Sequence, residues 1–301
     1  MRTAFLITTF LGCFFNMVAQ DNFLVYQLKG KATVTVNARS QPLRVGQILS
    51  KTALLRLDKA ASVGVLCANY IPMFFSNPEV RLDTVSLSCI KQQPSITASY
   101  FRFVWNELRH HPSAPENDRR RYMNNIGGAI RGCPGINFSI SPDTIRYLNA
   151  PLEISWKTQL ARDRLTINIY EDESGGSILA TLSVTKNFIS VDTLKKYSLG
   201  RSEVYWSILV DDQEHCSRNF LSFTELEIYN NIIRDAEIAT NAFTDAAEKN
   251  FLKGFYLEQQ RFYGEALLMY TEALDLEPNN KRYRKPVDDL TKIPNTQPSK
   301  Q

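Results

Sequence analysis

The chain has 301 residues, of which 44% are hydrophobic and 22% are charged, and its net charge at pH 7 is +4. This composition supports well-packed cores, and the length suggests two or three domains. The net charge is too small to indicate a nucleic-acid-binding protein.

Residues 1–20 have the pattern of a secretory signal peptide. Arg2 provides a positive charge, residues 4–15 form an apolar run, and residues 16–20 are suited to cleavage. The apolar run is too short to span a bilayer, and no later segment is long and apolar enough to do so. We therefore expect an exported chain, periplasmic or secreted, with no transmembrane span in its mature form.

A lipoprotein signal is the alternative interpretation, because Leu11-Gly12-Cys13 loosely resembles a lipobox. Apolar residues continue after Cys13, whereas a lipid-modified cysteine is normally followed by a polar linker. We therefore expect cleavage near Ala19 or Gln20, without lipid anchoring at Cys13.

The cysteines that follow the signal segment are Cys67, Cys89, Cys133 and Cys216. An oxidising compartment permits disulfides, and four cysteines allow three pairings. Cys67 and Cys89 fall in one predicted β domain, so they are the first candidate for a disulfide. The alternative is that all four are buried thiols, which is a common state of free cysteine.

Residues 21–92 are predicted to form a β domain. Apolar residues alternate in 32–36, 53–57 and, less strictly, 62–66, and turn residues separate these runs. Short strands at near-regular spacing are typical of a small sandwich or roll, and we expect β structure throughout this region.

The order of features in this region is more specific than its strands. Residues 30–34 are followed by a turn with Leu43, Gly46 and Leu49 in the spacing L-x-x-G-x-x-L, and then by 54–57 and 63–66. This order resembles the periplasmic β domain of FecR-like proteins. The transmembrane helix and cytoplasmic segment of FecR regulators are not seen in the sequence, so the resemblance implies their β domain and not their signalling role.

Residues 93–136 are predicted to form an amphipathic helix and a flexible linker. Ser95 is a candidate N-cap, and apolar residues follow at three- and four-residue steps from Ile96 to Leu108. Pro112 and Pro115 end this helix, and several glycines between 127 and 135 make the remainder a connector.

Residues 137–223 are predicted to form an immunoglobulin- or fibronectin-like β-sandwich. The expected strands are 152–156, 165–170, 178–184, 188–191, 204–210 and 219–223, with a weaker one near Phe138. Hairpin turns are expected at 171–176, 199–201 and 211–214. Short half-alternating strands of this number are typical of such a sandwich, in which Trp156, Tyr205 and Trp206 are expected to lie between the sheets.

Residues 224–284 are predicted to be helical, near 225–240, 242–259 and 263–276, and residues 285–301 to form a disordered tail. Within this region, residues 247–280 resemble one tetratricopeptide repeat. The resemblance rests on small residues that let two antiparallel helices approach, an aromatic residue between them and a proline after them: Gly254, Ala266, Tyr270, Ala273 and Pro278. The first helix departs from the family pattern, which has an aromatic residue and a leucine where this chain has Asn250 and Lys253, and a tyrosine where it has Leu257.

A single repeat cannot bury both of its faces, because several stacked units are usually needed. The hairpin is therefore expected to pack on the sandwich, on a partner or on a second copy. Tetratricopeptide repeats bind protein partners, and the expected binding face here consists of Phe255, Tyr256, Gln259, Phe262 and Tyr263. The alternative is an ordinary helical hairpin that closes the C-terminal end.

The sequence contains no recognisable catalytic or metal-binding motif. His110, His111 and His215 have no carboxylate at a metal-ligand spacing. The acidic runs at 171–173 and 211–214 are interpreted as exposed hairpin residues rather than as a calcium site, and the arginines 119–121 as part of a solvated linker. No catalytic residue, metal or cofactor is therefore predicted.

These features predict a multidomain, mainly β protein with two small β-sandwich or roll domains and a C-terminal all-α hairpin region. The expected function is that of an exported, non-enzymatic scaffold or adaptor that binds proteins in a Gram-negative cell envelope. A module that binds peptidoglycan or another glycan is the first alternative, and an enzyme of unrecognised type is the second.

Overall fold

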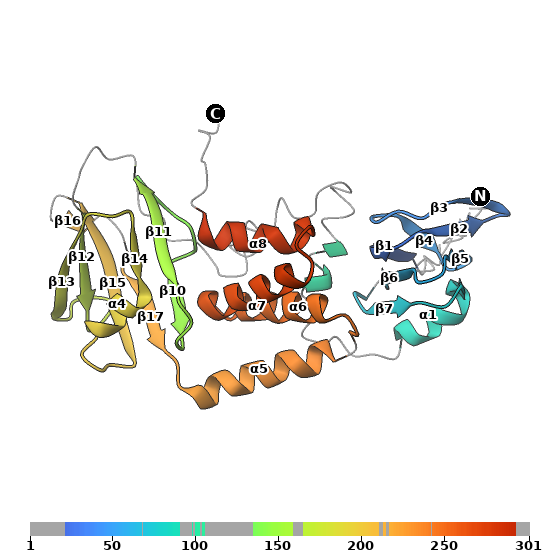
Figure 1. The fold of residues 1–301 in the computed structure, drawn as a ribbon. Helices are drawn as coiled ribbons and strands as arrows, with labels where there is room; N and C mark the ends of the chain where they lie inside the picture. Colours follow the sequence, from blue (N-terminus) through green and yellow to red (C-terminus); the bar gives the residue numbers. More distant parts are fainter. Residues whose placement is uncertain are drawn as a thin grey trace, which may run out of the picture. The chain divides into compact units, whose positions relative to one another are not determined.

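The computed structural model describes residues 22–67, 69–90, 98, 100–102, 104–105, 135–158, 165–210, 213–214, 217–241 and 243–292. It confirms the predicted class, a mainly β chain with helices at its C-terminal end (Figure 1). The chain divides into two compact units, Met1–Gln92 and Gln93–Gln301. Among the residues described, no helix has the length and apolar character needed to cross a membrane. The predicted signal segment, most of the predicted linker and residues 293–301 lie outside the described residues.

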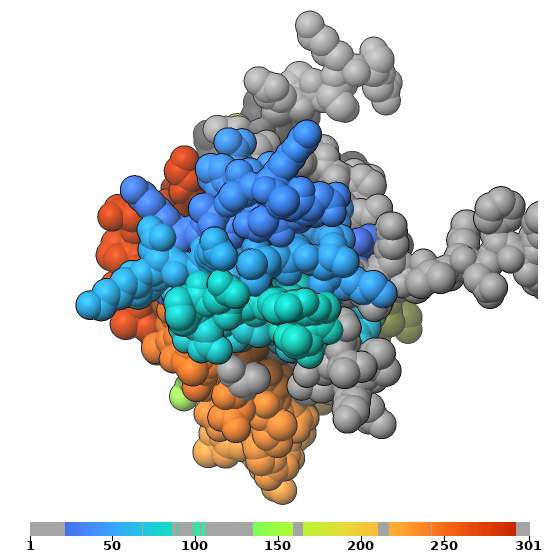
Figure 2. All heavy atoms as spheres, turned by 90° about the vertical axis from the view of Figure 1, so that its right-hand side faces the viewer, coloured from blue at the N-terminus to red at the C-terminus, as the bar shows by residue number. Residues whose placement is uncertain are grey.

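The described part of the N-terminal unit forms two four-stranded antiparallel sheets and one helix. The first sheet has the order β4-β1-β6-β7, with β1 (Asn22–Lys29), β4 (Ile48–Ser50), β6 (Ser62–Leu66) and β7 (Pro72–Phe75). The second has the order β3-β2-β5-β8, with β2 (Ala32–Val36), β3 (Arg39–Pro42), β5 (Leu54–Leu57) and β8 (Glu79–Arg81). Helix α1 (Leu82–Ile90, teal) follows and lies on the surface of the unit in Figure 2.

Alternating apolar residues from both sheets form the core of this unit. Val34 and Leu55 from the second sheet and Val63 and Val65 from the first are buried in one cluster, because successive side chains of a strand point to opposite faces. The chain passes from the first sheet to the second at Gly30, whose φ is +77° and whose added Cβ would lie 2.9 Å from Ala61 Cβ.

The predicted L-x-x-G-x-x-L turn joins β3 to β4. Leu43 and Leu49 are buried in the core, and Gly46 between them has a φ of +85°. The turn is held against β1, since the Gly46 N–H donates to the Val25 carbonyl at 2.7 Å and the Val25 N–H donates to the Gln47 carbonyl at 3.0 Å. The spacing therefore places two core leucines on either side of a left-handed glycine.

The expectation of β structure up to residue 92 is wrong for residues 82–90, which form α1. Local side-chain hydrogen bonds start this helix: the Asp83 carboxylate accepts the Thr84 N–H, and the Thr84 hydroxyl donates to the Arg81 carbonyl, both at 2.8 Å. Leu82 is fully buried and Val85 packs against the core, so tertiary packing favours the helix.

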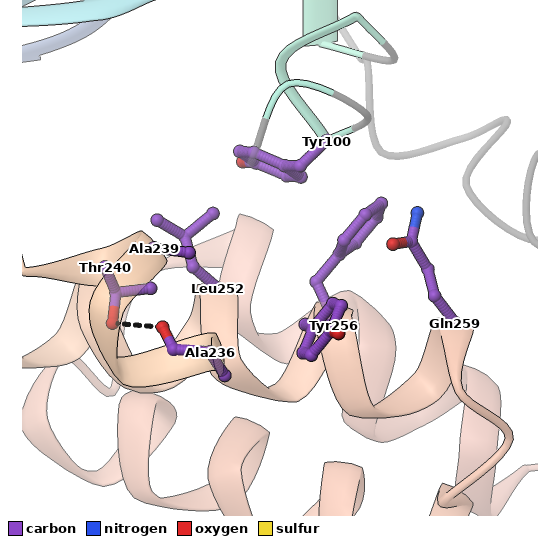
Figure 3. A pocket seen from close by; sticks show the side chains of 8 residues that line it. Tyr100, Ala236, Ala239, Thr240, Leu252, Tyr256 and Gln259 are labelled. Carbon is purple, nitrogen blue, oxygen red and sulfur yellow. Dashed lines mark hydrogen bonds between the residues drawn. The ribbon is translucent and has the colours of Figure 1, made fainter. Parts of the chain in front are cut away.

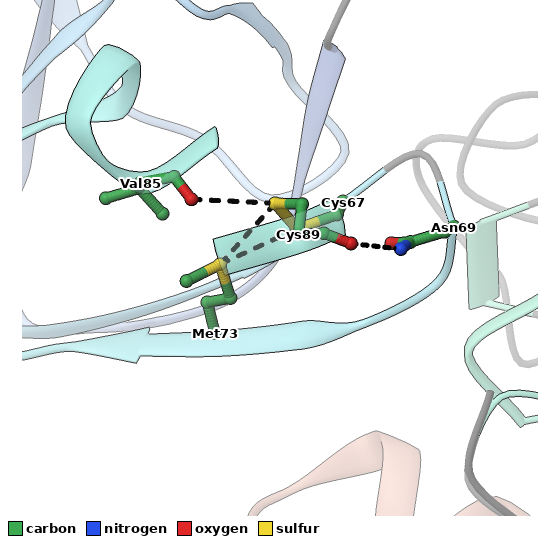
Figure 4. Close-up of a disulfide and its surroundings, with 5 residues drawn as sticks. All are labelled: Cys67, Asn69, Met73, Val85 and Cys89. Carbon is green, nitrogen blue, oxygen red and sulfur yellow. Dashed lines mark hydrogen bonds between the residues drawn. A yellow bond between two sulfur atoms is a disulfide. The ribbon is translucent and has the colours of Figure 1, made fainter. Parts of the chain in front are cut away.

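Cys67 at the end of β6 and Cys89 in α1 form a disulfide (Figure 4). These are the two cysteines that the sequence analysis placed in one domain; Cys133 and Cys216 lie outside the described residues. The Met73 sulfur lies 3.5 Å from Cys67 Sγ and 3.7 Å from Cys89 Sγ, which are van der Waals contacts because a disulfide carries no S–H. The Asn69 side chain donates to the Cys89 carbonyl. The bridge thus ties α1 to the first sheet.

In the described part of the C-terminal unit, residues 98, 100–102 and 104–105 are helical, and a β-sandwich follows. Its larger sheet has the order β10-β17-β15-β12-β13, with β16 beside β15, and comprises β10 (Thr144–Tyr147), β12 (Leu165–Tyr170), β13 (Ile178–Val184), β15 (Glu203–Val210), β16 (Gln213–Glu214) and β17 (Asn219–Phe223). The smaller sheet has the order β14-β11-β9, from β9 (Ile136–Phe138), β11 (Glu153–Thr158) and β14 (Phe188–Ser190).

The sandwich core contains the tryptophans that the sequence analysis placed there. Trp156 and Trp206 are fully buried, and each makes an edge-to-face contact with the Phe138 ring, at centroid distances of 6.3 and 6.1 Å. Tyr205 is only half-buried and packs on Phe220 instead. Trp156 and Trp206 therefore join the two sheets.

Two elements of the sandwich were not predicted. Strand β10 pairs in parallel with β17, and its four residues are too few to show an alternation. Helix α4 (Val191–Lys196) begins where a strand was expected to end, because the Ser190 side chain accepts the Thr193 N–H and caps the helix. The turn at 199–201 consequently joins α4 to β15 and is not a hairpin turn.

The C-terminal region contains helices α5 (Leu226–Thr240), α6 (Ala246–Gln259), α7 (Tyr263–Leu276) and α8 (Lys281–Thr291). The first three agree with the predicted helices within four residues. The prediction of disorder from residue 285 is wrong up to residue 291. Pro286 removes one hydrogen bond from α8, but the burial of Tyr283 and Leu290 and the cap from Asn280 hold the helix.

Candidate functional site

Helices α6 and α7 form the closely packed hairpin that the repeat resemblance implies. A Cβ added to Gly254 would lie 2.8 Å from Tyr270 Cδ1 and 3.1 Å from the Ala266 carbonyl oxygen. Ala266, Tyr270 and Ala273 are fully buried, and the Tyr270 hydroxyl donates to the Glu258 carboxylate at 2.7 Å. Only a residue without a side chain fits at position 254.

Pro278 follows the end of α7. Its carbonyl accepts a hydrogen bond from the Arg284 guanidinium at 2.6 Å.

Helix α8 covers one side of this hairpin through a buried carboxylate on α6. Glu248 is fully buried, and its Oε2 accepts a hydrogen bond from Tyr283 at 2.9 Å and pairs with Arg282. The Arg282 guanidinium also lies 5.0 Å from the centres of the Phe251 and Tyr283 rings. The charge of Arg282 balances the buried carboxylate, so α8 is attached by both packing and charge.

Helix α7 packs on the sandwich through a second buried carboxylate. Glu265 Oε1 accepts the backbone N–H groups of residues 148–150, at 3.1, 3.2 and 3.3 Å. A Cβ added to Gly264 would lie 2.9 Å from the Ala150 carbonyl oxygen, and the Arg146 N–H donates to the Arg261 carbonyl at 3.0 Å. Of the three surfaces on which the hairpin was expected to pack, the structure shows the sandwich.

The expected binding face is not a single exposed surface. Phe255, Phe262 and Tyr263 are only 2%, 0% and 3% exposed. The Phe262 ring packs on Tyr229 at a centroid distance of 5.5 Å, and the Tyr263 hydroxyl accepts a hydrogen bond from Arg261 at 2.7 Å. Burial of a large aromatic side chain is strongly favourable, so these residues hold neighbouring elements together and cannot meet a partner directly.

The other two expected residues, Tyr256 and Gln259, are half-buried and line a shallow pocket between α5 and α6 (Figure 3). The remaining lining residues are Tyr100, Ala236, Ala239, Thr240, Leu252 and Phe255. Tyr100 comes from the short helical pieces that precede the sandwich, and its ring lies 4.8 Å from that of Phe255. The sequence analysis did not include Tyr100 among the residues of this site, because about 150 residues separate Tyr100 from α6.

Tyr100 supplies a polar group to this apolar pocket. Its hydroxyl is buried without a hydrogen-bond partner among the described residues, and burial raises the pKa of Tyr100. The Thr240 hydroxyl, by contrast, is used within α5, where it donates to the Ala236 carbonyl at 2.8 Å. The pocket therefore offers mainly apolar surface, with the Tyr256 and Gln259 side chains at its rim.

Helix α5 also exposes large apolar side chains that do not line the pocket. Leu226, Ile228 and Ile238 are 60%, 51% and 70% exposed, whereas Ala236 and Thr240, which line the pocket, are buried. At about 100° per residue, Ile228 and Ile238 lie about 80° apart around the helix axis. We call Ile228 and Ile238 together the exposed side of α5. Several large apolar side chains exposed on one helix are candidates for contact with a partner.

The acidic loop at 171–173 has a structural role. Asp172 Oδ1 accepts the N–H groups of residues 174–176, at 3.0, 2.8 and 2.7 Å, and these hydrogen bonds lower the pKa of Asp172. Within the described ranges no three histidine, cysteine or acidic side chains are grouped as metal ligands would be. The three histidines, the arginines 119–121 and Asp211 and Asp212 lie outside those ranges.

Replacing Asp172 by alanine is expected to lower the melting temperature by a few degrees at pH 7, because the turn loses its acceptor. The folded-state pKa of Asp172 is lowered, so its contribution is present above the ordinary pKa of about 4 and is lost as the pH falls through the folded-state value. The difference in melting temperature between the two proteins should therefore shrink when thermal unfolding is repeated at pH 3. An equal difference at both pH values would contradict this role, and Glu203→Ala is the control for removing an exposed acid.

No protein-family model matches the chain, and a search of curated proteins finds none that is similar to it.

Proposed function

We propose that the protein is an exported, non-enzymatic scaffold or adaptor of the cell envelope, and that it binds another protein through the exposed side of α5. The observation that carries the proposal is the exposure of Ile228 and Ile238, at 51% and 70%. Such a helix surface fits a partner segment that presents apolar side chains.

Export is supported by two independent features. The first 20 residues have the charge and apolar pattern of a secretory signal. The disulfide between Cys67 and Cys89 is of a kind that persists in oxidising compartments and is rare in the cytosol.

Buried acidic groups hold the helices that carry this surface in a fixed arrangement. Glu248, Glu258 and Glu265 accept hydrogen bonds from Tyr283, from Tyr270 and from the backbone of residues 148–150. Each of these carboxylates joins one element to another, so a partner would meet a rigid surface.

The glycan-binding alternative has less support. Flat sugar rings are bound on exposed aromatic faces, but Trp156 and Trp206 of the sandwich are fully buried. Tyr197, 37% exposed, is the large aromatic side chain most open to solvent among the described residues of the sandwich.

The proposal is tested by replacing Ile238 with a photoreactive benzophenone amino acid and illuminating cells that make the protein. We expect discrete protein adducts from position 238 and none from Leu268, an exposed apolar position on α7 that serves as the matched control. Absence of adducts from 238, or the same adducts from both positions, would overturn the proposal.

A second variant shows whether the adducts need the apolar surface. With the photoreactive group at position 228, Ile238→Asp should abolish the adducts while changing the free energy of unfolding by less than about 0.5 kcal/mol, because Ile238 is 70% exposed. Co-sedimentation of the unmodified protein with purified peptidoglycan, unaffected by Ile238→Asp, would instead favour the glycan-binding alternative.

A further inference from the structure

Strand β13 (Ile178–Val184) ends the larger sheet of the sandwich (Figure 1). It pairs with β12 on one side, and no other strand of the described chain pairs with it on the other. Its outer N–H and C=O groups therefore form the kind of row that accepts another strand.

The composition of β13 does not protect this edge. Its seven residues, ILATLSV, include no charge, proline or glycine. Natural edge strands usually avoid pairing by being short or by carrying charges, prolines or bulges. A register shift between Ile178 and Ala180 disturbs only the start of β13, so residues 180–184 form a regular edge.

Other edge strands in the described residues do carry such protection. The residues concerned are Arg39 and Pro42 in β3, Pro72 in β7, Glu79 and Arg81 in β8 and Arg146 in β10. The remaining edge strands, β4, β9, β14 and β16, have two or three residues each. The unprotected edge of β13 is thus an exception among the edge strands that the structure describes.

The two faces of residues 180–184 differ in character. Ala180, Leu182 and Val184 point to one face and are only half-buried, while Thr181 and Ser183 point to the other and are exposed. A strand added beside β13 would cover the uncovered apolar surface of the first set and leave the second set in water.

We propose that a second copy of this chain pairs antiparallel with β13 across a two-fold axis at Leu182. This register places Ala180 opposite Val184, Thr181 opposite Ser183 and Leu182 opposite Leu182 of the partner. Apolar residues meet apolar residues on one face and hydroxyls meet hydroxyls on the other, and no like charges are brought together. The strand is thus complementary to itself, which is the argument for a second copy rather than for a different protein.

The test uses charge at Ser183, which is exposed on the hydroxyl face. In the proposed pairing the two copies of Ser183 are diagonal neighbours, about 7–8 Å apart, within reach of long side chains. Ser183→Lys and Ser183→Glu should each raise the dimer dissociation constant of the purified protein at least about tenfold in sedimentation equilibrium. An equimolar mixture of the two variants should dimerise again, because opposite charges then face each other.

The controls separate pairing from folding. Ser202→Lys adds the same charge at an exposed position of the sandwich away from β13 and should leave dimerisation unchanged. Circular dichroism identifies any variant that fails to fold, and recovery in the mixture shows that both are competent. A monomeric wild-type protein at about 100 μM, well above the dissociation constants of weak specific dimers, would overturn the proposal. So would a dimer that Ser183→Lys and Ser183→Glu leave intact.

Discussion

Replacing Glu265 by alanine is expected to lower the free energy of unfolding of the C-terminal unit by about 3 kcal/mol, because three backbone donors lose their buried acceptor. Glu265 Oε1 is the acceptor for the N–H groups of residues 148–150, and the side chain is only 3% exposed. Urea unfolding followed by far-ultraviolet circular dichroism measures the change.

Two further measurements make this prediction specific. Amide hydrogen exchange at residues 148–150 should accelerate in Glu265→Ala, since those hydrogen bonds attach α7 to the sandwich. Glu265→Gln keeps an oxygen acceptor without the charge and should cost less than alanine. Asp275→Ala, on the exposed side of the same helix, should stay within about 0.5 kcal/mol of wild type. Equal effects of Glu265→Ala and Asp275→Ala would contradict the role assigned to Glu265.

The second large effect is expected for Gly254→Val, which should destabilise the helical region by about 3 kcal/mol through overpacking. The added Cβ would approach the Tyr270 ring to 2.8 Å and the Ala266 carbonyl oxygen to 3.1 Å. The ring can shift, but the backbone of α7 can move away only if the two helices separate. Thermal and urea unfolding of the variant measure the loss.

A double-mutant cycle with Tyr270→Ala tests the cause. Tyr270→Ala alone removes a fully buried ring and is expected to be costly, but it should cost markedly less in the Gly254→Val background, because valine then fills part of the space. Gly175→Val is the control, since a Cβ at Gly175 meets nothing within 4 Å. Additive effects of the first two substitutions would show that the contact with Tyr270 is not the reason.

Local periodicity was enough to predict many elements. Strands 165–170, 178–184 and 219–223 and the helix at 263–276 have the predicted bounds. In each of them, apolar residues recur at the period of a strand or of a helix, so residues close together in the sequence are enough to predict the element. The buried positions of Trp156 and Trp206 were expected from the sandwich fold to which these strands were assigned, and the structure confirms them.

The missed elements depend on contacts between distant residues. Helix α8 has a polar sequence with a proline, and it is held by the burial of Tyr283 and by the pairing of Arg282 with Glu248, 34 residues away. Strand β10 forms by parallel pairing with β17, more than 70 residues later. A local pattern does not contain the free energy of such distant contacts. The sequence analysis therefore placed a disordered tail over most of α8 and assigned no strand to residues 144–147.

The prediction that five aromatic and polar residues form one exposed binding face was wrong for three of them, for a related reason. An aromatic residue on a helix is suited equally to a core and to an interface, and the sequence does not show what covers it. Phe255, Phe262 and Tyr263 meet Tyr100, Tyr229 and Arg261, whereas Tyr256 and Gln259 remain at the rim of a pocket. Tyr100 joins the site only through the tertiary fold.

The sequence by itself determined the mainly β class, the order of the β and helical regions and the close approach of two helices at Gly254, since each follows from residue size and periodicity along a short segment. Only the tertiary structure decided that the hairpin packs on the sandwich through Glu265, that most of its aromatic residues are buried and that β13 has a strand on one side only within the described part of the chain. Those outcomes depend on which surfaces come into contact in the folded chain. The free energy of burying two surfaces against each other depends on the residues of both, and these residues are far apart in the sequence.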